Sequence, residues 1–508
     1  MSETDNHTNA SQNSSAHKTM MPRSKVQKLY VINAMQKIMA AGGEQYIREH
    51  PDLTDDQVSL IRLIARCKTG QLGRMVYSCT GCGKEISIGK ACHNSQCSNC
   101  QSLETAIFTE ENMGFRVDAP YFHIVFTVPD DLLEIFKMNK VLCYNLILEA
   151  SSKTVLDLCE DPQWLGGAPG IMSVLQTFGS KINYRPHVHM VVAAAALNKD
   201  HSAILRTPSD IFIRKNGSYR KQFFIPEAVM EPMYRGKFLD GLQKSRRKGE
   251  LRLPDDLCNQ ASWDRFIDHL YSMNWIIYCK QTFNGNGDAL KYVSRYIGRI
   301  AIGNSRIKRL TDTEVTYSYK DYKDGSKIKN RTVTIQQFIG LYIQHVLPHG
   351  FKKVRYYGFL AANHRKKCLD AFTRIQGKRI YESRFNRKTK KRDIIRILYD
   401  REKGLKCPSC GEPSLELLRE EDSKGFTVHT YQAHPLRERL RITFSEQNAK
   451  TQKRILRAKA AYRDKGYFHQ LSWFSQKSGP DPDGLISEIR WAISSFGEEM
   501  LSIDWDLA

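Results

Sequence analysis

The stretch NYRPHVHMVV, residues 183–192, places His187 and His189 two positions apart in a largely apolar run. Side chains alternate between the two faces of a strand, so both imidazoles share one face while the apolar residues around them share the other. Two imidazoles one strand repeat apart can hold a single metal ion. The alternative is a pair of core histidines with satisfied ring nitrogens, and the rest of the chain has to decide between the two interpretations.

The composition of the chain points to nucleic acid. Its 508 residues exceed one compact core, so roughly two to four domains are expected. Lys and Arg number 77 against 54 acidic residues, a net charge of +23, which predicts a polyanionic partner. The sequence has neither an apolar run of about 18 residues nor a signal-peptide core, so a cytoplasmic, nucleoid-associated protein without a membrane partner is expected.

Thirteen cysteines, most of them clustered, indicate metal ligands rather than disulfides. The pairs Cys79-x2-Cys82 and Cys97-x2-Cys100 are two thiolate knuckles, and together they predict one tetrahedral structural zinc site. Three more potential ligands lie nearby: Cys67, Cys92 and His93. They are not needed for this site, replace one of its ligands, or help to form a second site, and these alternatives stay open.

A further knuckle, Cys407-Pro-Ser-Cys410, lies in the C-terminal part of the chain. His429 and His434 follow it at a loose spacing and are candidates for the remaining ligands of a possible second zinc site.

The segment LKYVSRYIGRIAI carries Tyr292 and Tyr296, four residues apart, interleaved with Arg295 and Arg299. On a helix these tyrosines project from one face. Core packing is the usual reason for such a pair, but here the surroundings are basic. A tyrosine hydroxyl can attack a phosphodiester while a metal polarises its non-bridging oxygens, which leaves a 5′-phosphotyrosine and a free 3′-OH.

These motifs, in this order, resemble a known family, the HUH-type rolling-circle transposases of bacterial insertion sequences. The similarity is to the two-tyrosine, zinc-bearing IS91 branch and covers about residues 60–365. It rests on these blocks: CKTGQLG, CSNCQ, YFHIVFTVP, PHVHMVV, YVSRYIGRIAI and HVLPHGFKKVRYYGFLAANHRKK. The chain departs from the family where Gln176 and Gln96 stand in place of histidines.

The resemblance implies that His187 and His189 bind a catalytic Mg²⁺ or Mn²⁺ and that Tyr292 and Tyr296 are the nucleophiles. The third metal ligand stays open between His123 and Gln176. Structural zinc would occupy the cysteines. The resemblance also implies an α+β fold, with an antiparallel sheet flanked by helices, a helical zinc-binding N-terminal domain and a basic, mainly helical C-terminal region.

Five segments are expected along the chain. They are a disordered tail (1–24), a helical and zinc-binding DNA-binding domain (25–106), the HUH domain (107–305) with an insertion at about 200–255, a basic DNA-binding extension (306–400) and a C-terminal region with the possible second zinc knuckle (401–508).

The expected substrate is single-stranded DNA at transposon ends and in target DNA, because a basic excess tracks a nucleic-acid backbone. The candidate phosphate contacts are Lys280, Arg295, Arg299, Lys352, Lys353 and Arg355. No GK[ST] loop is present, so strand displacement would fall to host replication or helicase machinery.

Three other functions compete with this prediction. A plasmid replication initiator or relaxase-type nickase uses the same chemistry. A zinc-dependent DNA-binding regulator without catalysis would carry the histidines and tyrosines in its core. A hydrolytic metallonuclease would not need the tyrosines.

Overall fold

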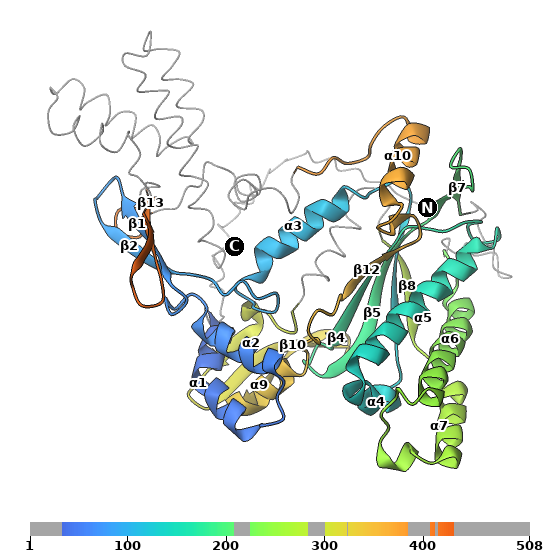
Figure 1. The fold of residues 1–508 in the computed structure, drawn as a ribbon, viewed down its shortest axis with the longest axis horizontal. Helices are drawn as coiled ribbons and strands as arrows, with labels where there is room; N and C mark the ends of the chain where they lie inside the picture. The colour runs from blue at the N-terminus through green and yellow to red at the C-terminus, as the bar shows by residue number, and fades with distance from the viewer. Residues whose placement is uncertain are drawn as a thin grey trace, which may run out of the picture.

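The structure is a computed structural model, and it describes residues 33–207, 224–282, 300–322, 324–384, 407–411 and 415–430. Figure 1 shows a central sheet with helices on both faces, a helical lobe beside it and a separate small sheet. The expected α+β fold with antiparallel sheets is confirmed. Among the described helices, none is both long and apolar enough to span a bilayer.

The central sheet is antiparallel throughout. Its strands lie in the spatial order β12 (Val354–Tyr357), β4 (Ile171–Phe178), β5 (Tyr184–Ala193), β3 (Tyr121–Thr127) and β8 (Ile277–Thr282). The HVH stretch is therefore part of β5, in the middle of the sheet, with a strand on each side.

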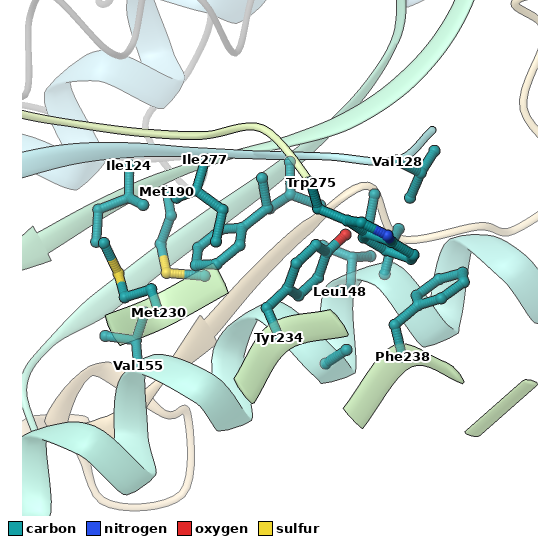
Figure 2. Packing of buried hydrophobic residues seen from close by; sticks show 14 of the residues in the cluster. Ile124, Val128, Leu148, Val155, Met190, Met230, Tyr234, Phe238, Trp275 and Ile277 are labelled. Atoms are coloured by element: carbon teal, nitrogen blue, oxygen red, sulfur yellow. The ribbon is translucent and has the colours of Figure 1, made fainter. Parts of the chain in front are cut away.

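One face of this sheet is covered by helices and holds the largest core (Figure 2). The helices are α4 (Leu133–Met138), α5 (Lys140–Glu160), α6 (Glu227–Arg247) and α7 (Gln260–Ser272). Helix α6 lies within the segment at about 200–255 that the sequence predicts to be an insertion, and it contributes to the largest core. Its apolar residues recur every four positions, so Met230, Tyr234 and Phe238 are fully buried against the sheet and against Trp275.

Among the described residues, the elements that cover the opposite face lie at one end of it and form a smaller core. The covering elements are α3 (Gln101–Met113), η4 (Gly358–Leu360) and α10 (Arg365–Gln376). Phe359 and Phe372 pack there over Met172, Val174 and Val191. The histidines stand further along the same face, beyond this apolar cover.

A helical lobe lies beside the sheet (Figure 1). Its helices are α1 (Ala34–Glu49), α2 (Asp55–Arg66) and α9 (Ile335–Ile343), and its strands are β9 (Ile307–Leu310), β10 (Glu314–Asp321) and β11 (Lys327–Thr334). Strands β10 and β11 form a hairpin that turns at Asp324-Gly325: Gly325 has a positive φ of 55°, and the amide of Lys327 donates to the carbonyl of Asp324. Capping boxes at Thr54 and Thr334 begin α2 and α9.

The separate small sheet is built from two distant parts of the chain. Its strands lie in the order β14 (Thr427–Thr430), β13 (Leu415–Glu421), β1 (Arg74–Cys79) and β2 (Glu85–Gly89). The remaining short elements are η1 (Asp130–Leu132), η2 (Asp255–Leu257), η3 (Asn304–Arg306), β6 (Ala195–Leu197) and β7 (Ile204–Arg206).

The described parts of two expected segments pack with other regions of the chain. In segment 306–400, α9 packs on α1 while β12 completes the central sheet, so its residues are divided between two cores. In segment 401–508, β13 pairs with β1 of the N-terminal zinc-binding region. Sequence order misleads here because antiparallel pairing joins strands that are far apart in the chain.

Candidate functional site

The two histidines of the HVH motif stand on one face of β5, as the alternation predicts. His189 lies opposite Val125 of β3, and His187 lies opposite Thr127. Both β3 residues are half-buried, whereas Phe126 on the other face is fully buried. The histidine end of this face is thus more accessible than the helix-covered side.

The geometry of the two rings suits a shared metal ion. Nε2 of His187 lies 3.1 Å from Nε2 of His189. Adjacent ligands of an octahedral ion with bonds of 2.0–2.1 Å are about 3 Å apart, so both atoms can bind one divalent ion. Nδ1 of His187 lies 2.7 Å from the carbonyl oxygen of Arg185. A proton on that Nδ1 would donate to this carbonyl and leave Nε2 free to bind metal.

His123, one of the two candidates for the third ligand, lies behind the pair. It sits on the neighbouring strand β3, and its Nε2 lies 2.8 Å from Nδ1 of His189. It therefore contacts the other ring nitrogen of His189, as a residue that orients a ligand does. Burial, and then the nearby His187, lower the pKa of His123 to about 4, so its ring is neutral at physiological pH.

Gln176, the other candidate, lies directly opposite His187 on β4 and is buried. It also lines a cavity of about 330 Å³, which α2, the loop at 94–96 and the loop at 345–351 enclose. A carboxamide oxygen at this position can approach an ion held by the two imidazoles. Among the described residues, the compact groups of three or more His, Cys, Asp or Glu side chains are cysteine clusters, so no third ligand of these types joins the histidines.

The predicted basic contacts fall on different sides of the sheet. Lys280 of β8 lies opposite His123, on the histidine face, and is exposed. Lys352 is exposed, while burial lowers the pKa of Lys353, which lines the cavity beside Gln176. Arg355 pairs with Ser173 on the other face, and its guanidinium bonds to the side chain of Asn145 on α5. We therefore exclude Arg355 from the proposed DNA-binding face.

The predicted nucleophiles Tyr292 and Tyr296, with Arg295 and Arg299, lie outside the described residues. A different tyrosine, which the sequence did not single out, stands on the histidine face. Tyr278 of β8 pairs with Val125, and 49% of its surface is exposed. An apolar–polar alternation in WIIYCKQTF is the signal that places it on this face of an edge strand.

The cysteines form two compact groups that differ from the predicted set. One group is Cys67, Cys92, Cys97 and Cys100, and the other is Cys79, Cys82, Cys407 and Cys410. The two N-terminal knuckles thus separate into different clusters, and the expectation that they share one ion is corrected. Each knuckle folds as expected, but β1 and β2 carry the first knuckle away from the second.

Of the two histidines proposed for the C-terminal knuckle, His429 is described and does not belong to these groups. His429 lies on β14, opposite Glu420, and His434 lies outside the described residues. Cys79 and Cys82 provide the remaining ligand atoms instead. The loose spacing of the histidines was therefore a poor guide.

The spacing of the sulfur atoms fits zinc. A tetrahedral ion with Zn–S bonds of about 2.3 Å places its sulfurs about 3.8 Å apart. In the first cluster, Sγ of Cys67 lies 3.6 Å from that of Cys100 and 3.7 Å from that of Cys97. In the second, Cys79 and Cys410 are 3.6 Å apart, and Cys82 and Cys407 are 3.7 Å apart.

Known proteins match the chain in the same regions. A family described as "Transposase zinc-binding domain" matches residues 38–128, and one described as "Putative transposase" matches residues 170–368. The chain is 32% identical over 330 residues to "Putative transposase y4qJ" of Sinorhizobium fredii. The matched residues make up 64% of this chain and 80% of that protein.

A second relative is the "Transposase for insertion sequence element IS801" of Pseudomonas savastanoi pv. phaseolicola. It is 26% identical over 324 residues, covering 62% of this chain and 73% of that protein. No solved structure matches the chain. With its paired zinc-binding and transposase regions, this chain belongs to the IS91-like family of transposases.

Proposed function

We propose that this transposase cuts and rejoins single-stranded DNA at the ends of its element by metal-assisted transesterification. A tyrosine oxygen attacks the phosphorus, a new O–P bond forms and the bond to the 3′ oxygen breaks. The tyrosine gives up its proton, and the released 3′ oxygen takes one up. The phosphotyrosine keeps the bond energy, so the reverse attack by a 3′-OH rejoins DNA without ATP.

The observation that carries this proposal is the 3.1 Å separation of the two Nε2 atoms on the less covered face of the sheet. A divalent ion bound there would neutralise charge on the non-bridging oxygens of a phosphodiester. Exposed Lys280 on the same face would attract the DNA backbone.

Tyr292 and Tyr296 are the proposed nucleophiles, because two tyrosines allow two successive strand transfers without release of DNA. The described residues on either side of their segment support this choice. Thr282 ends β8, beside the histidine-bearing strands, and Ile300 lines the cavity that holds Gln176.

The test is a covalent trapping assay. Full-length protein is incubated with labelled single-stranded DNA carrying the element ends and with Mn²⁺ or Mg²⁺, then denatured. We expect labelled DNA that migrates with the protein, lost in Tyr292→Phe/Tyr296→Phe and in His187→Ala/His189→Ala. The single tyrosine variants identify which residue attacks first.

Two matched controls make the result specific. Tyr278→Phe removes an exposed tyrosine of the histidine face, and His269→Ala removes an exposed histidine of α7; both variants should keep the adduct. Cleavage without an adduct would instead support a hydrolytic metallonuclease. Binding without cleavage of any strand would support a zinc-dependent regulator.

Plasmid replication initiators and relaxases share this chemistry, so the adduct alone does not separate them from a transposase. An assay with a donor plasmid that carries the insertion sequence and a separate target plasmid would distinguish them. Transfer of the marked element to the target supports transposition, whereas nicking confined to one origin supports an initiator.

A further inference from the structure

Two short stretches that lie far apart in this chain have the same sequence pattern and the same backbone geometry. CTGCGK begins at Cys79 and CPSCGE begins at Cys407. In each, the glycine after the second cysteine has a positive φ, 74° at Gly83 and 73° at Gly411. Its amide donates to the carbonyl of the first cysteine, at 2.8 Å in the first stretch and 2.7 Å in the second. Both are therefore tight turns that aim two sulfurs at one point.

The two turns face each other. The sulfurs meet in the crossed pairs Cys79–Cys410 and Cys82–Cys407, at the spacing of a tetrahedral zinc site. Backbone amides point at two of the sulfurs: that of Cys82 lies 3.3 Å from Sγ of Cys79, and that of Ser409 lies 3.4 Å from Sγ of Cys407. Such donors stabilise the thiolate form that binds metal.

The strand that leads into the first turn, β1, is paired with the strand that follows the second, β13. β13 lies antiparallel to β1, and salt bridges cross between the two parts of the chain, from Lys90 to Glu420 at 2.7 Å and from Arg419 to Glu85 at 3.1 Å. The apolar cluster beneath them is small, however. Its buried members are Tyr77, Cys79, Cys407, Leu415 and Leu417.

We propose that Cys79, Cys82, Cys407 and Cys410 form a second zinc site that fastens residues 407–430 onto the N-terminal zinc-binding region. A sheet of this size with so small a core lacks the apolar burial to be stable alone, so metal binding would provide most of its folding energy. Four thiolates in a tetrahedral arrangement are a typical ligand set for structural zinc. Cys407 and Cys410 lie outside both regions that match known families, 38–128 and 170–368.

The chain is also fixed to the N-terminal part shortly before the proposed site. Upstream of it, the guanidinium of Arg384 binds both carboxylate oxygens of Glu110, at 3.1 and 2.8 Å. Glu110 is buried on α3, which begins directly after the first cluster. Arg384 is thus held by α3, and Cys407, the next described residue, is held by the proposed second zinc site.

The first experiment counts zinc by elemental mass spectrometry in full-length protein purified without chelators. We expect two zinc ions per chain, one for each cluster. Cys407→Ser/Cys410→Ser should contain one. The matched control Cys258→Ser, an exposed cysteine outside both clusters, should keep two. One zinc ion in the unaltered protein, or two in the double variant, would overturn the proposal.

A second experiment tests the attachment itself. A protease recognition sequence inserted after Arg384 allows the intact, folded chain to be cut. We expect the C-terminal fragment to co-elute with the N-terminal part in gel filtration, and to separate in Cys79→Ser/Cys82→Ser. Co-elution in that variant would show that strand pairing alone holds the fragment and would contradict the proposed role of zinc. Neither experiment depends on catalysis.

Discussion

The histidine site and the cysteine clusters are both groups of metal ligands, but they rest on different scaffolds. His187 and His189 stand on a strand in the middle of a five-stranded sheet, whose register fixes their separation. The cysteines lie mostly on turns and loops, one cluster at the core of the helical lobe and the other beside a small apolar cluster. The difference suggests that the histidine pair is built without metal, whereas the cysteine regions need metal to fold.

The largest expected effect follows from removing zinc. Cys67 and Cys97 are buried in the core of the helical lobe, and structural zinc contributes about 10–16 kcal/mol in small domains, as much as the stability of a whole protein. Strong chelation should therefore unfold the lobe and leave the central sheet folded. Hydrogen exchange should rise sharply in α1, α2 and α9 but not in β3–β5. If the amides of the lobe stayed protected from exchange after chelation, the lobe would not need zinc to fold and would not differ from the central sheet in this respect.

The opposite behaviour is expected of the histidines. His187→Ala removes a half-buried side chain from a sheet that is already complete, so unfolding free energy should change by less than about 1 kcal/mol. Adduct formation should nevertheless fall below detection. Thermal unfolding and the trapping assay, run on one preparation, check both statements. A variant that loses activity only because it unfolds would contradict the idea of a prebuilt site.

A smaller effect is expected at His123. Its contact with Nδ1 of His189 orients a ligand rather than providing one, and such partners contribute about 10–100-fold to metal affinity or activity. His123→Ala should need more Mn²⁺ for half-maximal adduct formation and recover most of its activity at saturating Mn²⁺. Failure to recover would indicate that His123 is itself the third ligand.

The smallest effect is a pH dependence of stability at His345. This ring is buried between Thr177 and the carbonyl of Ile182, and burial lowers its pKa to about 4, against about 6.5 for an unfolded histidine. Unfolding therefore takes up a proton between these values. The contribution of His345 to the free energy of unfolding is therefore complete above pH 6.5. It falls by about 1.4 kcal/mol for each pH unit between 6.5 and about 4.

The measurement compares the protein with His345→Gln at pH 7.5 and pH 5.5 by denaturant unfolding. The unaltered protein should lose about 1.4 kcal/mol more than the variant between these conditions. Zinc release at the lower pH affects both proteins alike and cancels in the difference. Equal losses would show that His345 is not held neutral by the fold.

The sequence predicted those features that depend on local periodicity. The shared face of His187 and His189 follows from the two-residue period of a strand, and each CxxC turn follows from a few neighbouring residues. The pairing of cysteines did not, because a CxxC pair shows where two ligands lie and not which distant pair completes the site.

Burial of helix α6 was missed for a related reason. The segment at 200–255 is polar and basic on average, and this composition led us to expect an insertion. Only one stripe, which includes Tyr234 and Phe238, meets the core. Which face of such a helix is covered depends on α5 and the sheet, which are distant in sequence.

The central claim is that a tyrosine of this chain becomes joined to DNA through phosphorus. The most direct test is to trap the adduct with Mn²⁺, digest the protein and identify the DNA-bearing peptide by mass spectrometry. We predict a phosphonucleotide on Tyr292 or Tyr296. Attachment at Tyr278, the exposed tyrosine of the histidine face, would contradict the assigned nucleophiles, and cleaved DNA without any modified peptide would contradict the covalent mechanism.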